Sequence, residues 1–162
     1  MMHNPVWTRT MVATQRVISG MLLILLSVAP SWGGQFFEQD GIAIRGYDPV
    51  AYFTRGTPMQ GVPEFHAVFQ GSTFYFASAI HRDIFLANPE KFSPQYGGFC
   101  AYGMAKGYKA STDPVAFTVV GEKLYLNYSG TVRALWIFDI SGYVKKADHN
   151  WPALRLTTRV TP

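Results

Sequence analysis

The sequence predicts an α+β fold, in which a small antiparallel sheet built from two β-hairpins packs against helices. Two observations carry this prediction. Runs with strand character occur in pairs, and each pair is joined by a short turn that contains glycine, at residues 70–72 and 121–122. Each pair of runs is followed by a segment with helical periodicity.

The first half of the domain begins with a short helix predicted over residues 48–53. Asp48 is a suitable N-cap, and Pro49 at the first helical position loses no hydrogen bond. A loop is expected over residues 54–63. Strands are expected over residues 65–69 and 73–78.

A helix is predicted over residues 79–87, with Ser78 as its cap and Asn88-Pro89 as its end. Its apolar side chains share one face, as a helix packed on a sheet requires. These side chains are Ile80, Ile84 and Phe85.

The second half begins with a glycine-rich stretch that ends at Gly107 and is expected to be a loop with a short helical piece. The second hairpin is predicted from strands at residues 117–120 and 123–128. A helix over residues 131–146 follows, with a break expected at Ser141-Gly142.

The two halves repeat one another in outline. Residues 48–52 (DPVAY) recur as residues 113–117 (DPVAF), each ahead of a hairpin that leads into a helix. Two such turn–hairpin–helix units could pair their sheets and share one core. The alternative is that Asp-Pro helix starts and glycine turns coincide because both are common.

The N-terminus predicts a secretory signal over residues 1–33. Arg9 and Arg16 precede an uncharged apolar run at residues 17–29, and small residues follow it. Pro30 interrupts the run before it reaches the roughly 20 residues of a membrane span. We therefore expect cleavage near residues 31–34, a periplasmic or secreted protein, and no stable membrane span after cleavage.

The remaining chain is divided into a domain at residues 34–154 and a C-terminal tail at residues 155–162. Without Arg9 and Arg16, 12 of the 14 basic residues stand against 10 acidic ones, which leaves a net charge of +2. No basic cluster is larger than Lys145-Lys146, so we expect no nucleic-acid partner. Aromatic residues make up 15% of the chain, which indicates a stiff core or a pocket lined with rings.

The single cysteine, Cys100, follows Gly97-Gly98-Phe99 and cannot form an internal disulfide. It is either a small core residue or a soft, reactive group. Met104 lies four residues later, so a helical turn there would place both sulfur atoms on one face.

Four motifs in this order resemble the exported YHS-domain proteins of bacteria, and the match covers about residues 40–154, nearly all of the predicted mature chain. The resemblance implies a small periplasmic module without a defined reaction. The motifs are residues 46–53 (GYDPVAYF), 96–102 (YGGFCAY), 123–128 (KLYLNY) and 150–154 (NWPAL).

Shorter YHS modules are regarded as metal-binding and carry the pattern Tyr-Phe-Cys-Ser-x-x-Cys. The corresponding stretch here is residues 75–81, where Ala77 holds the first cysteine position and His81 the second. The resemblance thus implies that the paired-thiolate site is absent. A mixed site of Cys100, His81, His66 and Met104 could replace it, and these ligands favour copper, with zinc as the other metal.

Two other function classes compete with a non-catalytic, metal-binding module. The first is a module without metal, in which the aromatic residues line a small-molecule or haem pocket or a partner surface. The second is a thiol enzyme with Cys100 as nucleophile and His81 as base. The chain carries no oriented triad signature and no nucleotide-binding glycine motif, which disfavours catalysis and nucleotide cofactors.

Overall fold

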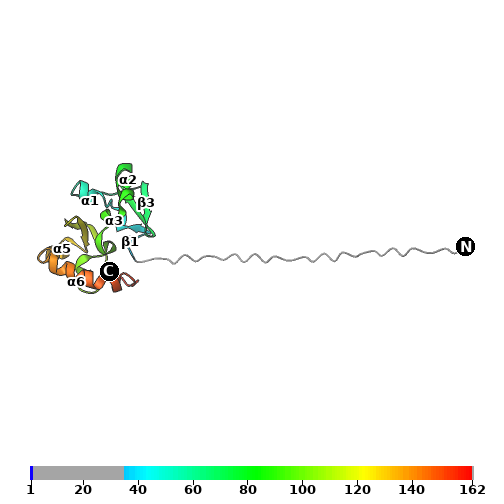
Figure 1. Cartoon of the computed structure of the whole chain (residues 1–162). Helices are drawn as coiled ribbons and strands as arrows, with labels where there is room; N and C mark the ends of the chain where they lie inside the picture. Colours follow the sequence, from blue (N-terminus) through cyan, green and yellow to red (C-terminus); the bar gives the residue numbers. More distant parts are fainter. Residues whose placement is uncertain (2–34, 162) are drawn as a thin grey trace. The chain divides into compact units, whose positions relative to one another are not determined.

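The computed structural model describes Met1 and residues 35–161. Within this part the fold is α+β, as predicted: six α-helices pack with a four-stranded mixed sheet and a separate two-stranded hairpin (Figure 1). The predicted signal sequence and its cleavage site lie outside residues 35–161. In residues 35–161, no helix combines the length and the apolar character that crossing a membrane requires.

The four-stranded sheet has the order β1-β2-β4-β3. Its strands are β1 (Glu38–Gln39), β2 (Ile42–Ala43), β3 (Val62–Phe69) and β4 (Ser72–Phe76). The first hairpin, β3–β4, turns where predicted, because Gln70 and Gly71 both adopt the positive φ that a two-residue hairpin turn needs. The added strand β2 pairs in parallel with β4, a pairing that the local sequence pattern does not predict.

Two strand boundaries in this hairpin differ from the prediction. β3 begins at Val62, ahead of the expected residue 65, and its register shifts between Val62 and His66, where Pro63 has no N–H for the ladder. β4 ends at Phe76, two residues earlier than expected. The N–H of the next residue, Ala77, donates instead to the Asp48 carboxylate.

The second hairpin consists of β5 (Asp113–Val120) and β6 (Lys123–Asn127), with Gly121 and Glu122 both at positive φ in the predicted turn. It forms its own sheet. The expectation that the two hairpins join in one sheet is therefore wrong, because within residues 35–161 β5 and β6 pair with each other and with no strand of the first sheet.

The two halves of the domain still share a cluster of core residues. Tyr52 and Ile44 from the first half pack with Leu124 and Leu126 from the second. The Tyr52 ring lies 4.9 Å from that of Phe117, and its hydroxyl donates to the Pro114 carbonyl. Apolar contact, not strand pairing, thus holds the two repeat units together.

Local capping marks both units. Ser78 accepts the N–H of His81 at the start of α2, and Ser129 accepts that of Val132 at the start of α5. The predicted helix over residues 79–87 is confirmed as α2. The helices are α1 (Ala51–Thr54), α2 (Ala79–Ala87), α3 (Pro89–Phe92), α4 (Ala101–Ala105), α5 (Gly130–Ile137) and α6 (Ile140–Leu154), with 3₁₀ segments η1 (Ile44–Gly46) and η2 (Gln95–Gly98).

The predicted break at Ser141-Gly142 is wrong. The chain breaks at Phe138 and Asp139, because the Asp139 carboxylate accepts the N–H of Gly142 and starts a new helix there. α6 then continues to Leu154, well past the expected end at residue 146. One aspartate cap thus outweighs the low helix propensity of the Ser-Gly pair.

Residues 155–161 lie against the domain. The buried Lys109 donates through Nζ to the carbonyls of Arg155 and Thr157, at 3.2 and 2.7 Å. The N–H of Thr161 donates to the Lys109 carbonyl, and Thr161 forms a parallel bridge with Ala110. The segment predicted as a tail is thus tied to the loop that follows α4.

Candidate functional site

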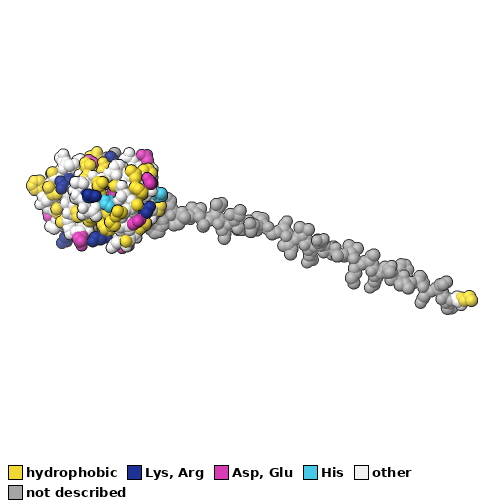
Figure 2. Space-filling model, turned by 90° about the horizontal axis from the view of Figure 1, so that it is seen from above, with side chains coloured by type: hydrophobic (Ala, Val, Ile, Leu, Met, Phe, Trp, Pro, Cys, Tyr) yellow, Lys and Arg dark blue, Asp and Glu magenta, His cyan; other side chains and the backbone are white. Residues whose placement is uncertain are grey.

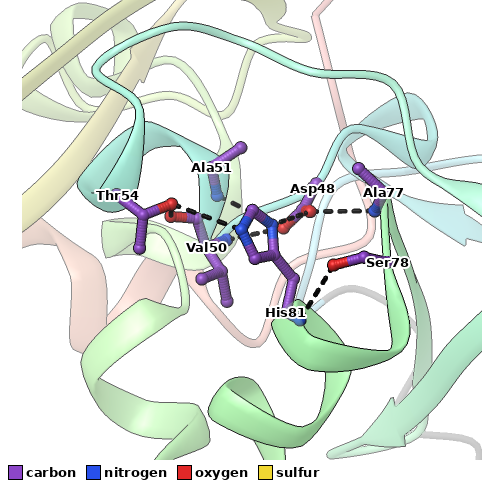
Figure 3. A network of polar contacts seen from close by, with 7 residues as sticks. All are labelled: Asp48, Val50, Ala51, Thr54, Ala77, Ser78 and His81. Atoms are coloured by element: carbon purple, nitrogen blue, oxygen red, sulfur yellow. Dashed lines mark hydrogen bonds and ion pairs between the residues drawn. The ribbon is translucent and has the colours of Figure 1, made fainter.

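A fully buried carboxylate, Asp48, lies where α1, the end of β4 and the start of α2 meet (Figure 3). Its Oδ1 accepts the N–H groups of Val50 and Ala51, at 2.9 and 3.3 Å. Its Oδ2 accepts the N–H of Ala77 at 2.9 Å. The carboxylate therefore satisfies backbone donors from two segments that are far apart in the sequence.

His81 completes this cluster from the first turn of α2. Its Nδ1 lies 2.5 Å from Asp48 Oδ2, and its Nε2 lies 3.4 Å from the Thr54 hydroxyl (Figure 3). An ionised carboxylate only accepts hydrogen bonds, so Nδ1 carries the proton and Nε2 keeps its lone pair in the neutral ring. The His81 side chain is 12% exposed, beside the exposed Thr54. Nε2 is therefore the ring atom available to a ligand.

Sequence reasoning selected His81 but treated Asp48 only as a helix cap. The two residues are 33 positions apart, and no periodic pattern links them. The feature of the sequence that could have indicated this contact is the charge of Asp48. An aspartate inside an otherwise apolar motif, residues 46–53, needs a buried partner.

Cys100 is a buried structural thiol, 1% exposed. Its Sγ accepts the N–H groups of Gly103 and Tyr128, at 3.4 and 3.3 Å, and lies 3.8 Å from Asn127 Oδ1, to which it donates. The sulfur thereby caps α4 and ties it to the end of β6. Burial raises the pKa of the thiol above its usual 9.0, against the smaller lowering effect of the backbone donors.

The structure does not bring the four predicted metal ligands together. Met104 is buried in the core with α6, and His66 lies exposed on β3 with Nδ1 2.8 Å from the Pro63 carbonyl. In residues 35–161, no three His, Cys, Asp or Glu side chains form a group that could hold a metal ion. The four residues therefore do not form one metal site.

The Cys100–His81 pair of a thiol enzyme is not formed either, because the thiol donates to Asn127. The aromatic residues largely pack in the core rather than around a cavity. Phe36 meets Phe74 edge-on at 5.1 Å, and the rings of Tyr125 and Trp136 also lie 5.1 Å apart. The high aromatic content therefore reflects a stiff core rather than a pocket lined with rings.

We expect native Cys100 to resist alkylation between pH 7 and about 9, and to react fast once the protein is denatured, because the thiolate is the reactive form. Since folding favours the protonated thiol, its contribution to stability is present below pH 9.0 and is lost as the pH rises through the higher pKa of the folded state. Iodoacetamide labelling followed by mass spectrometry measures this. Equal rates in native and denatured protein would contradict it.

Comparison of the chain with models of protein families, with curated proteins and with solved structures gives no match. The resemblance to YHS-domain proteins thus stays a prediction. The class of protein described by fold and site is a small α+β domain with a carboxylate-oriented histidine close to its surface.

Proposed function

We propose that this chain is an exported, non-catalytic binding module of the YHS type, which takes a metal ion at His81 Nε2. The observation that carries the proposal is the hydrogen bond from His81 Nδ1 to the buried Asp48 carboxylate. Histidines that bind metals almost always donate their other ring N–H to such a group, which fixes the tautomer and the ring orientation.

Copper and zinc both suit an imidazole ligand. The preference for copper in the sequence came from the thiolate of Cys100 and the thioether of Met104, and both side chains are buried in the core. The proposal therefore includes both metals. A single imidazole binds a metal ion weakly. Water, or a molecule that delivers the ion, therefore supplies the other ligands of the metal. Weak binding of this kind suits a module that transfers metal to another molecule.

The hydroxyl of Thr54 does not support a hydrolase in place of a binding module. The contacts from Asp48 to His81 and from His81 to Thr54 have the order of the acid, base and hydroxyl in a hydrolytic triad. The Thr54 hydroxyl, however, donates to the Val50 carbonyl at 3.1 Å, a bond within its own helical turn. Its proton is directed away from His81.

His81→Asn is the variant that tests the site. An asparagine amide can still donate to Asp48, whereas the Nε2 atom is lost. We expect copper(II) or zinc(II) affinity to fall by at least about tenfold, because the proposed ligand atom is gone. The full chain is expressed, and the protein is purified as the cell processes it and titrated with each metal by calorimetry.

His66→Asn is the matched control, because His66 is exposed and lies outside this cluster. It should bind both metals as the wild type does. Thermal unfolding of both variants verifies that each is folded. Equal affinity in the His81 and His66 variants, or a wild type that binds neither metal at millimolar concentration, would overturn the proposal.

A further inference from the structure

An apolar groove lies at the junction of α5 and α6, beside the end of the second hairpin. We call this surface the elbow face. Its volume is about 600 Å³. Its apolar lining includes Val120, Ile137, Phe138, Ile140 and Val144, and its polar lining includes Lys123 and Asp139. Figure 2 shows hydrophobic side chains at the end of the molecule where Figure 1 places α5.

Phe138 is 86% exposed, and Ile137 and Val120, which also line this surface, are 44% and 38% exposed. Phe138 is exposed because of the break between the helices. Trp136 fills the core and Asp139 caps α6, so Ile137 and Phe138, the two residues between them, face solvent. In residues 35–161 the Phe138 ring makes no ring–ring contact. An aromatic ring held in water at a helix junction favours a partner that covers it.

The exposed Phe138 ring and the groove belong to the same surface, the elbow face. That arrangement suits a two-fold symmetric pair, in which each copy offers the same patch and each contact occurs twice. The Phe138 ring of one copy can enter the groove of the other, while the reverse contact forms across the axis.

The charged side chains that line the groove also suit a two-fold symmetric pair. Lys123 and Asp139 both line it, one of each sign, and the structure gives neither an ion-pair partner within residues 35–161. In a two-fold pair, Lys123 of each copy can meet Asp139 of the other. The groove is thus close to neutral, which gives an anionic lipid surface or a nucleic acid no electrostatic advantage.

We propose that the elbow face binds a second copy of this chain. The surface is small, so the dimer is weak and depends on concentration. This inference concerns a different part of the molecule from His81 and does not rest on metal binding.

Phe138→Asp tests the dimer, because it places a carboxylate where the ring would be buried. The full chain is expressed, the protein is purified as processed, and its mass is measured by sedimentation from about 1 μM to about 1 mM. We expect the wild type to pass from monomer to dimer over this range. Phe138→Asp should lower the association constant by at least about tenfold.

Ile80→Asp is the matched control, because Ile80 is 71% exposed on α2, away from the elbow face. It should dimerise as the wild type does. Lys123→Glu should also weaken the dimer, more strongly at low salt, because two like-charged contacts replace two ion pairs. A wild type that stays monomeric at every concentration, or equal association by Phe138→Asp and Ile80→Asp, would overturn the proposal.

Discussion

Replacing Asp48 with alanine lowers the free energy of unfolding by about 3–5 kcal/mol, because one buried carboxylate serves several donors at once. The carboxylate accepts the N–H groups of Val50, Ala51 and Ala77 and the Nδ1 of His81. Alanine leaves these donors without their acceptor, and a buried unsatisfied donor costs about 1–3 kcal/mol. Chemical denaturation followed by circular dichroism measures the change.

The internal repeat supplies the control. Asp113 holds the equivalent position in the sequence repeat, at the first residue of β5, but within residues 35–161 its carboxylate accepts only the N–H of Val115, in an exposed setting. Asp113→Ala should cost about 0.5–1.5 kcal/mol, the net contribution of one ordinary hydrogen bond. If both aspartate variants lose the same stability, the Asp48 cluster does not hold α1, β4 and α2 together as described.

Replacing Phe85 with alanine lowers the free energy of unfolding by a similar amount, about 3–5 kcal/mol. Phe85 is fully buried on α2. Its ring lies 5.1 Å from those of Phe74 and Phe76 and 5.9 Å from that of Phe69. Alanine would leave a cavity between α2 and the sheet that these rings cannot fill without leaving their own packing.

Leu86→Ala is the neighbouring control, because Leu86 is 55% exposed on the other side of the helix. Its effect should stay within about 0.5 kcal/mol. The same denaturation measurement applies to both variants. A Phe85→Ala protein that is as stable as Leu86→Ala would mean that α2 does not pack through Phe85.

The two variants differ in what else they change. Asp48→Ala removes the group that orients His81, so it should weaken metal binding as well as stability. Phe85→Ala leaves the Asp48–His81 contact in place. A loss of metal affinity in the first variant alone, measured while both proteins remain folded, would assign the effect to orientation of His81.

The sequence predicted well those turns and caps that depend on residues close together in the chain. The turns at Gln70-Gly71 and Gly121-Glu122, and the Ser78 cap of α2, follow from backbone preferences and side-chain reach within a few positions. The break between α5 and α6 was misplaced because two local signals compete there. The Asp139 cap prevails over Ser141-Gly142 once α6 packs through Ala147.

Strand partners and burial depend on residues far apart in the chain. Cys100 has the same local sequence whether it is exposed or buried, and its burial follows from contacts with Asn127 at the end of β6 and with the next residue, Tyr128. The pairing of β2 with β4 and the Asp48–His81 contact likewise arise from chain closure over tens of residues.

The sequence alone therefore establishes the α+β class, both hairpin turns and the Ser78 cap of α2, because each depends on local backbone geometry. The folded structure was needed to separate the two sheets, to place Cys100 in the core, and to leave His81 Nε2 as the available donor. These outcomes depend on the sum of non-local packing and hydrogen bonding, which no short segment of the chain encodes.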